Sequence, residues 1–309
     1  MKKKVQVLLS VYKPNIEYLK KQLDSINNQT YKNIEVLIND DCPTDKCDKR
    51  VFKEALKKIK YRFLPYDKQN LGYNKSFEKL VRSSDKNSYI SFCDQDDIWD
   101  SDRIETLVKT LEKDNVEFVT HDRRIIDKDG KVVLKSFFAT QKGIYKDWYK
   151  GHDIVQTTPF LTLVPGMSIF CTTEFAKTNL PYEPFAYDKY LSCCACFENT
   201  ISKVDRPLTS YRRHGNNVSG VLAGIKDKKD YYINRVQIHN RLVNRLKNKY
   251  KNKYNMESII AFSNARMNKN ILNLYRYRKI SPIQAKFEIL LAITPNFLFK
   301  LFLRIKKIK

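Results

Sequence analysis

The chain has 309 residues, of which 42% are hydrophobic and 12% are aromatic, with only 8 glycines and 10 prolines. This composition excludes an intrinsically disordered chain and a collagen-like repeat, and the length suffices for one large domain or two ordinary ones. The net charge of +24 makes nucleic acids and anionic membrane surfaces candidate partners.

The first 123 residues alternate between short apolar runs and segments with helical spacing of apolar residues. We predict strands at residues 5–12, 34–41, 61–64, 89–93 and 116–120. Helices are predicted at residues 14–28, 45–60 and 74–83, and after Ser101, which we expect to cap the last of them. This order is typical of βαβ units and indicates an α/β fold with a mostly parallel central sheet.

The pattern becomes less regular beyond Arg123. A turn is predicted at residues 128–130, and regular apolar spacing returns at residues 164–172. We interpret residues 124–220 as a second half that packs on the same sheet, so that residues 1–220 form one domain and residues 1–123 its nucleotide-binding half.

The remaining segment, residues 221–309, has 21 Lys and Arg residues against 4 Asp and Glu, a net charge of +17. We predict that it is helical from about residue 226, with Pro282 and Pro295 dividing it. Its most apolar stretch, residues 289–303, is too short and too interrupted to span a membrane. Basic residues around Phe297, Phe299 and Phe302 fit an interfacial segment among anionic headgroups, and a helix pair that closes the core is the alternative.

The seven cysteines are odd in number and irregularly spaced. This favours reduced thiols in a cytoplasmic protein over a disulfide framework, and the N-terminus shows no signal-peptide pattern. A zinc site built from Cys193, Cys194 and Cys196 lacks the usual paired CxxC spacing.

Polar side chains follow three of the predicted strands, at the edge of the sheet where α/β proteins bind ligands. Clustered carboxylates repel one another unless a cation lies among them, and oxygen ligands suit Mg²⁺ or Mn²⁺. The sequence therefore predicts a metal-bound phosphate at this edge. The residues are Ser10 and Tyr12 at the end of the first strand, Asp40 and Asp41 at the end of the second, and Asp94, Asp96 and Asp97 where the fourth stops.

Six motifs, in order along residues 3–220, resemble those of the family 2 glycosyltransferases. The resemblance implies the GT-A nucleotide-sugar fold, and the details of the last motifs are similar to rhamnosyltransferase-like members that build bacterial surface polysaccharides. The motifs are LSVY at residues 9–12, NDDCPTD at 39–45, NLG at 70–72, CDQDDIW at 93–99, YDKY at 187–190 and YRRHGNNVSG at 211–220.

The resemblance implies a role for each matching residue. Ser10 and Tyr12 would hold the nucleotide base, and Asp41 would accept a hydrogen bond from a pyrimidine imide, which selects a UDP- or dTDP-sugar. Further donor contacts would come from Asp94 and Asp96. The metal ligands implied are Asp96, Asp97 and His214, and the cations that would pair with the diphosphate are Arg212 or Arg213, with Lys75 as a further candidate.

Asp188 matches the catalytic base of the family, which takes the proton from the acceptor hydroxyl in an inverting single displacement. The chain departs from the usual pattern at several positions. Cys42 and Pro43 replace Gly-Ser after the two acids, Tyr187 and Lys189 flank Asp188, and Phe77 stands where many members have an arginine.

The leading interpretation is an inverting, metal-dependent glycosyltransferase that acts on a lipid-linked glycan in capsule or surface polysaccharide synthesis. Its basic segment would hold it on the inner face of the cell membrane. A nucleotidyltransferase is an alternative, although residues 10–14 lack a glycine-rich phosphate loop. The second alternative is a nucleic-acid-binding protein, in which four tyrosines could stack on bases. Those tyrosines are Tyr231, Tyr232, Tyr275 and Tyr277. In the leading interpretation, the protein has no nucleic acid partner.

Overall fold

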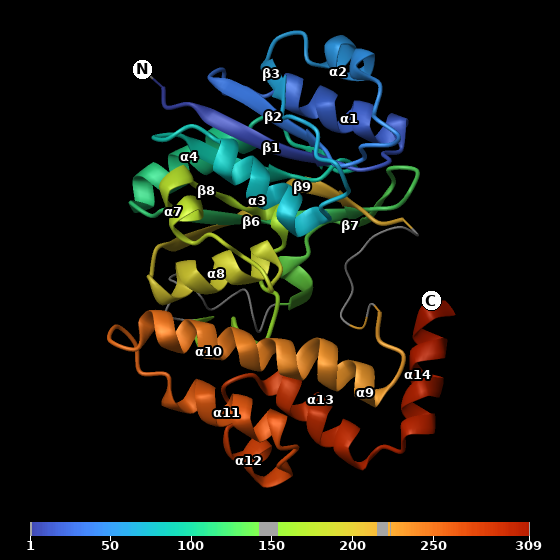
Figure 1. Ribbon diagram of the computed structural model, residues 1–309, viewed down its shortest axis with the longest axis vertical. Coiled ribbons are helices and arrows are strands. Elements are labelled where there is room, and N and C mark those ends of the chain that lie inside the picture. Colours follow the sequence, from blue (N-terminus) through green and yellow to red (C-terminus); the bar gives the residue numbers. More distant parts are fainter. Residues whose placement is uncertain (1, 142–153, 215–221, 223, 309) are drawn as a thin grey trace. The chain divides into compact units, whose positions relative to one another are not determined.

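The structure is a computed structural model that describes residues 2–141, 154–214, 222 and 224–308 (Figure 1). Contacts divide the chain into two units. The N-terminal unit comprises Met1–Asp153 and Val164–His214, and the C-terminal unit comprises Ile154–Leu163 and Gly215–Lys309. The end of the last sequence motif, residues 215–220, and the expected domain boundary at residue 220 lie outside the described residues.

The N-terminal unit begins with parallel strands whose Val, Leu and Ile residues are buried, because helices cover the sheet. The strands pair in the order β3-β2-β1-β4, and the four predicted strands are confirmed to within one residue at each end. The elements are β1 (Val5–Val11), α1 (Ile16–Asn27), β2 (Ile34–Asp40), α2 (Lys49–Ala55), β3 (Lys60–Phe63), α3 (Tyr73–Ser83) and β4 (Tyr89–Cys93).

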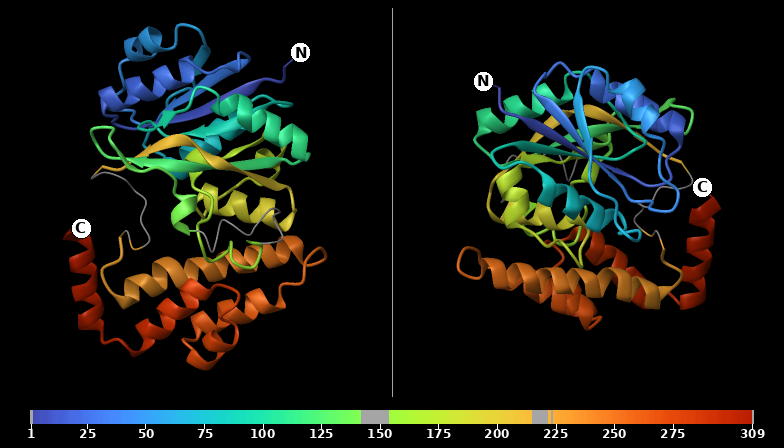
Figure 2. Two further views of the ribbon diagram at one scale, coloured as in Figure 1. Left: turned by 180° about the vertical axis from the view of Figure 1, so that it is seen from behind. Right: turned by 45° about the horizontal axis from the view of Figure 1, so that its top comes forward.

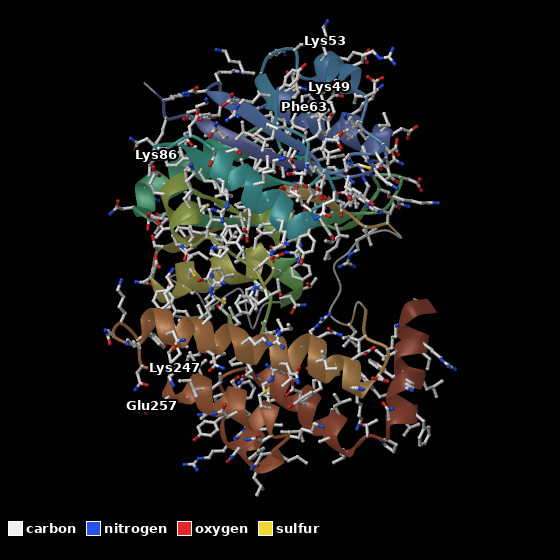
Figure 3. All side chains as sticks on the ribbon, viewed as in Figure 1. Lys49, Lys53, Phe63, Lys86, Lys247 and Glu257 are labelled. Atoms are coloured by element: carbon white, nitrogen blue, oxygen red, sulfur yellow. The ribbon has the colours of Figure 1, made fainter. Side chains whose placement is uncertain are left out.

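Helix α2 is shorter than the predicted residues 45–60. Asp48 caps it, since its carboxylate accepts a hydrogen bond from the backbone N–H of Arg50 at 2.9 Å. Lys49 then lies over the ring of Phe63 in β3, 4.9 Å from its centroid, which ties the helix to the edge strand (Figure 3).

The rest of the sheet is mixed (Figure 2). Strand β8 runs antiparallel to both β4 and β6, whereas β6 and β9 are parallel, and β5 and β7 pair antiparallel with β9 and β6. The prediction of a mostly parallel sheet is thus confirmed for the half formed by β3-β2-β1-β4. The further elements are β5 (Ile98–Trp99), α4 (Arg103–Asp114), β6 (Phe118–Ile126), β7 (Val132–Leu134), β8 (Phe170–Thr172) and β9 (Ile201–Arg212).

Two details of this half differ from the sequence expectation. Strand β6 continues to Ile126 rather than ending near residue 120, because β9 pairs with it along its whole length. The residue that precedes α4 is Asp102 rather than Ser101, and its side chain makes no capping hydrogen bond. The turn at residues 128–130 is confirmed, with Gly130 at a φ of +89°.

Short helices complete the N-terminal unit: the 3₁₀ turns η1 (Phe138–Gln141) and η2 (Gly166–Ser168), α7 (Thr173–Thr178) and α8 (Tyr187–Phe197). Helix α8 is buried along nearly its whole length, and it contains the three clustered cysteines. They are free thiols, and no cluster of metal-binding side chains is found among the described residues, so the structure gives no support to a zinc site there.

The C-terminal unit is helical, as predicted, with Pro282 at the start of α13 and Pro295 immediately before α14. Phe299 lies in a core cluster with Ile225 and Val236, which corrects its assignment to the interfacial face. No helix in the described part of the chain is long and apolar enough to cross a bilayer. The elements are α9 (Lys228–Tyr231), the π-helical turn η3 (Tyr232–Gln237), α10 (Ile238–Tyr250), α11 (Glu257–Met267), α12 (Ile271–Arg276), α13 (Pro282–Ile293) and α14 (Asn296–Ile308).

Candidate active site

The ends of β1, β2 and β4 meet at one edge of the sheet. Ser10 is in register with Asn39 and Leu9 with Cys93, so the loops that follow these parallel strands gather there. The backbone N–H of Tyr12 donates to the Gln95 side chain at 2.9 Å, and the Gln95 amide donates back to the Tyr12 carbonyl at 3.1 Å. The loop after β1 is therefore bonded to the loop that carries the three aspartates.

Tyr12 and Ser10, the two predicted base contacts from β1, differ in their surroundings. The Tyr12 ring is 46% exposed, which leaves a face on which a base could stack. The Ser10 hydroxyl is hydrogen-bonded to the Ser76 hydroxyl at 2.7 Å, and the amide of Asn39 also donates to Ser76 at 2.8 Å. Ser76 of α3 thereby joins that helix to both β1 and β2.

Asp41 is buried and organises the segment that leads into α3. Its carboxylate accepts hydrogen bonds from the Leu71 N–H at 2.8 Å, the Gly72 N–H at 2.9 Å and the Asn70 side-chain amide at 2.8 Å. Burial raises the pKa of Asp41, and the two backbone bonds oppose that shift. Since a carboxylate has about four acceptor positions, one is left for the predicted pyrimidine imide.

Gly72 has a φ of +77°, a conformation that glycine adopts without the strain of a side chain. This explains the glycine of the NLG motif: the chain turns sharply into α3 while the Leu71 and Gly72 N–H groups reach Asp41.

The acidic loop brings Asp96 to His214. His214 Nε2 lies 2.7 Å from Asp96 Oδ2 in a hydrogen bond that joins residues 118 positions apart. Partial burial and the charges of Asp96 and Asp188 raise the pKa of Asp94 to about 7. The negative charges near Asp94 repel one another, which favours a bound cation or proton at this loop.

Asp97 is placed differently from Asp96. It is fully buried, one oxygen accepts the Arg212 backbone N–H at 3.0 Å, and the other oxygen has no hydrogen-bond partner. Burial raises the pKa of Asp97 well above its ordinary range. In the described residues, no three His, Cys, Asp or Glu side chains form a metal-binding group, so the predicted trio of Asp96, Asp97 and His214 is not assembled as such.

Arg212 was predicted to contact the diphosphate, but in the structure its side chain binds the main chain of the protein itself. Its side chain is fully buried and donates to the main-chain carbonyls of Asp96 at 2.9 Å and Lys128 at 3.2 Å. The guanidinium also lies 4.3 Å from the centroid of the Tyr18 ring. Arg212 therefore holds the acidic loop in place. Arg213 is exposed and Lys75 forms an ion pair with Glu183 at 3.6 Å, so both stay candidates.

Asp188 lies in the first turn of α8, where the helix dipole favours a negative charge. Its carboxylate accepts the Lys189 N–H at 2.7 Å and a hydrogen bond from the Gly166 backbone. Burial raises the pKa of Asp188, and its charge in turn raises the pKa of Asp94. The predicted base and the acidic loop therefore belong to one electrostatic site.

Asn74 and Gly166 support this helix, and neither was identified from the sequence. The Asn74 amide donates to the Phe185 carbonyl at 2.8 Å, and its oxygen accepts the Tyr187 N–H at 2.8 Å. It thus caps α8, whose own N-cap residue, Ala186, offers no side-chain hydrogen bond. A Cβ on Gly166 would lie 1.9 Å from the Tyr187 hydroxyl, so only glycine fits there.

Two departures from the family pattern pack on each other. Tyr187 precedes Asp188, and its ring lies 4.5 Å from that of Phe77, centroid to centroid, and stacks on Phe92 at 4.8 Å. Phe77 and Tyr187 therefore belong to one buried aromatic cluster with Phe92, in which Tyr187 is the residue directly before Asp188 in the chain. A single sequence offered no signal that these two positions are in contact.

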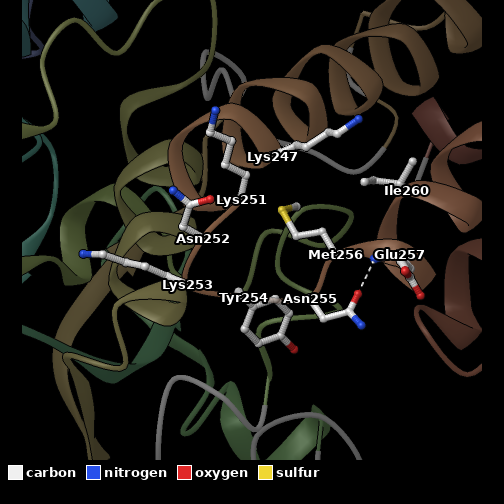
Figure 4. A pocket seen from close by; sticks show the side chains of 9 residues that line it. All are labelled: Lys247, Lys251, Asn252, Lys253, Tyr254, Asn255, Met256, Glu257 and Ile260. Atoms are coloured by element: carbon white, nitrogen blue, oxygen red, sulfur yellow. Dashed lines mark hydrogen bonds between the residues drawn. The ribbon is translucent and has the colours of Figure 1, made fainter.

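A separate pocket of about 540 Å³ lies in the C-terminal unit between α10 and α11 (Figure 4). Lysines border it, and it contains none of the predicted site residues. Its lining residues are Lys247, Lys251, Asn252, Lys253, Tyr254, Asn255, Met256, Glu257 and Ile260.

Comparison with known proteins identifies related sequences. The family described as Glycosyl transferase family 2 matches residues 7–173, more than half of the chain. An uncharacterized glycosyltransferase of Nostoc is 25% identical over 69% of this chain, which spans 66% of that relative's length. The Escherichia coli UDP-Glc:alpha-D-GlcNAc-diphosphoundecaprenol beta-1,3-glucosyltransferase WfgD is 28% identical over 64% of this chain and 73% of its own.

Solved structures share the fold. Residues 1–349 of Staphylococcus aureus TarS in complex with UDP-GlcNAc superpose with a TM-score of 0.62 at 15% identity, covering 93% of this chain and 84% of that TarS fragment. A Pyrobaculum calidifontis mannosyltransferase in complex with GDP-Man and Mn²⁺ gives a TM-score of 0.54 at 14% identity, covering 97% of this chain and 84% of that one. These similarities show the GT-A fold for the chain.

Proposed function

The chain belongs to glycosyl transferase family 2, and on that premise we propose that it transfers a sugar from a UDP- or dTDP-sugar to a hydroxyl group of a lipid-linked glycan. The observation that carries the proposal is the position of Asp188, a carboxylate at a helix N-terminus within the field of the Asp94 and Asp96 loop. A general base beside a cluster that can hold a metal diphosphate is what glycosyl transfer requires.

On the donor side, Asp96 and His214 would hold a divalent cation, Mn²⁺ or Mg²⁺. A carboxylate oxygen and an imidazole nitrogen, 2.7 Å apart, are suitable ligands, and such cations commonly take the rest of their ligands from substrate phosphates and water. When bound, the cation would stabilise the negative charge of the departing nucleoside diphosphate. Asp41 and Tyr12 would hold the base, and Arg213 or Lys75 would approach the diphosphate.

On the acceptor side, Asp188 would take the proton from the attacking hydroxyl group. The hydroxyl oxygen would form the new bond to the anomeric carbon, while the bond from that carbon to the diphosphate oxygen breaks on the opposite face. The nucleoside diphosphate leaves and the configuration at the anomeric carbon inverts. No covalent intermediate with the protein is needed, since one displacement completes the transfer.

A lipid-linked acceptor is supported by the similarity to WfgD, whose name specifies a diphosphoundecaprenol-linked sugar, and by the charge of +17 on residues 221–309. We therefore propose that the enzyme works peripherally on the cytoplasmic face of the cell membrane in capsule or surface polysaccharide synthesis. A deoxysugar donor such as dTDP-rhamnose is the expectation from the motif details, and UDP-glucose is the donor named for WfgD.

The test is to incubate the protein and Mn²⁺ with UDP-glucose, UDP-GlcNAc or dTDP-rhamnose and a GlcNAc-diphosphate lipid. We expect release of UDP or dTDP and a glycosidic product of inverted anomeric configuration by NMR. Release of pyrophosphate would instead support the nucleotidyltransferase alternative, and a retained configuration would exclude the single displacement.

Replacing Asn74 by alanine is expected to lower kcat by about 10²-fold, because α8 would lose the side chain that caps it and fixes the start of the Asp188 turn. The affinity for UDP should be unchanged, since the Asn74 side chain directs its hydrogen bonds to Phe185 and Tyr187 at the start of α8. Steady-state kinetics and calorimetric UDP binding on the same preparation separate the two effects. Asn252→Ala, at an exposed asparagine, serves as the control, and an Asn74→Ala enzyme with full kcat would contradict this role.

A further inference from the structure

Helix α14, the last helix of the chain (Figure 1), is anchored in the C-terminal unit but carries exposed apolar side chains. Phe299 and Leu303 are buried in the core cluster that includes Ile225 and Tyr231. Five other apolar residues of α14 are between 43% and 70% exposed. We call them the α14 stripe: Phe297, Leu298, Leu301, Phe302 and Ile305.

The stripe has the spacing of one helix face, since its members recur at intervals of three and four residues. The end of the preceding helix α13 has two more exposed apolar residues, since Leu290 and Ile293 are 52% and 71% exposed. Seven large exposed apolar side chains within residues 290–305 are unusual for a surface that meets only water.

Cations accompany the stripe. Lys300 and Arg304 are exposed on the same helix, and the sequence adds Lys306, Lys307 and Lys309 at its end. Lys300 is 3.9 Å from Asp227, the nearest approach of an acid to this helix among the described ion pairs. An apolar face next to lysine and arginine, on a helix that does not span a bilayer, is typical of segments that lie in the plane of an anionic membrane.

We propose that α14 is the membrane-docking element of this protein. The α14 stripe inserts among the lipid chains at the headgroup boundary, and Lys300 and Arg304 contact anionic headgroups. The proposal extends the proposed function by naming the element that brings the enzyme to a lipid-linked acceptor. It is tested without any enzymatic reaction, so its failure and the failure of the glycosyltransferase proposal can be told apart.

The experiment is co-sedimentation of the full chain with vesicles of phosphatidylcholine alone or with phosphatidylglycerol. We expect strong binding only to the anionic vesicles. The double variant Leu301→Gln, Phe302→Gln should bind them at least about tenfold more weakly, because two exposed side chains lose their apolar contact with lipid. The control is Leu272→Gln, Tyr275→Gln on α12, two residues outside the stripe that are 81% and 60% exposed, and it should bind as the wild type does.

A second variant separates charge from apolar contact. Lys300→Glu, Arg304→Glu should reduce binding to anionic vesicles and weaken its dependence on salt. Equal vesicle binding by the wild type and the stripe variant would overturn the proposal. It would also be overturned by a wild type that is dimeric in light scattering and a stripe variant that is monomeric, since the stripe would then be covered by a second copy of the chain.

Discussion

Asp188→Asn is expected to lower the rate of sugar transfer by at least about 10³-fold while leaving UDP binding unchanged. Asparagine has the same shape, and its oxygen can still accept the hydrogen bond that the Lys189 N–H donates to Asp188 Oδ1. It cannot take a proton from the acceptor. Single-turnover transfer and calorimetric titration with UDP and Mn²⁺ measure the two quantities separately.

The pH dependence of the wild type provides an independent check on Asp188. The base must be deprotonated to act, and burial raises its pKa, so the transfer rate should fall with decreasing pH at a higher pH than an ordinary aspartate would give. Asp24→Asn, at an exposed position on α1, is the matched control and should transfer at the wild-type rate. If Asp188→Asn retains transfer, Asp188 is not the base.

Glu288→Ala is expected to destabilise the C-terminal unit by about 3–5 kcal/mol. Arg266 is almost fully buried, and its guanidinium donates to Glu288 at 2.6 Å and 3.0 Å. The Tyr231 hydroxyl donates to the same carboxylate at 2.8 Å, and burial together with the charge of Glu288 raises the pKa of Tyr231. Removing the carboxylate leaves a buried cation without its counter-ion and a tyrosine without its acceptor.

Urea unfolding monitored by circular dichroism measures this loss. Glu257→Ala, at an exposed glutamate of α11 in the same unit, should change the stability by less than about 0.5 kcal/mol. A double replacement, Arg266→Leu with Glu288→Leu, should recover much of the stability, since no unpaired charge is left behind. A loss for Glu288→Ala as small as that of the control would show that the pair does not stabilise the unit.

The parallel half of the sheet could be predicted because its main strands are short, continuous runs rich in Val, Leu and Ile. Such a run is typical of a buried strand. Residues 5–11 and 34–40 are of this kind. The pairing of β8 between β4 and β6, and the association of Ile154–Leu163 with the C-terminal unit, depend on contacts between residues far apart in the chain. No local pattern encodes such contacts.

The candidate site shows the same contrast between features that can be predicted from the sequence and features that depend on contacts between distant residues. Asp41 and Asp96 were predicted because polar residues at the ends of strands stand out in the sequence, whereas Asp188 and His214 were predicted only from the resemblance to family 2 glycosyltransferases. Arg212 was assigned to the donor because arginine commonly binds phosphate, whereas burial commits its guanidinium to main-chain carbonyls. The capping role of Asn74 was not predicted, since it acts on a helix more than a hundred residues away.

The central claim is a metal-dependent site for a nucleoside diphosphate at the sheet edge. Its most direct test is calorimetric titration of the protein and of Asp96→Asn with UDP, dTDP and GDP, each with and without Mn²⁺. The account predicts that UDP or dTDP binds only with Mn²⁺ and that Asp96→Asn loses this binding, because Asp96 and His214 would hold the cation. Binding that needs no Mn²⁺, or that Asp96→Asn retains in full, would contradict it.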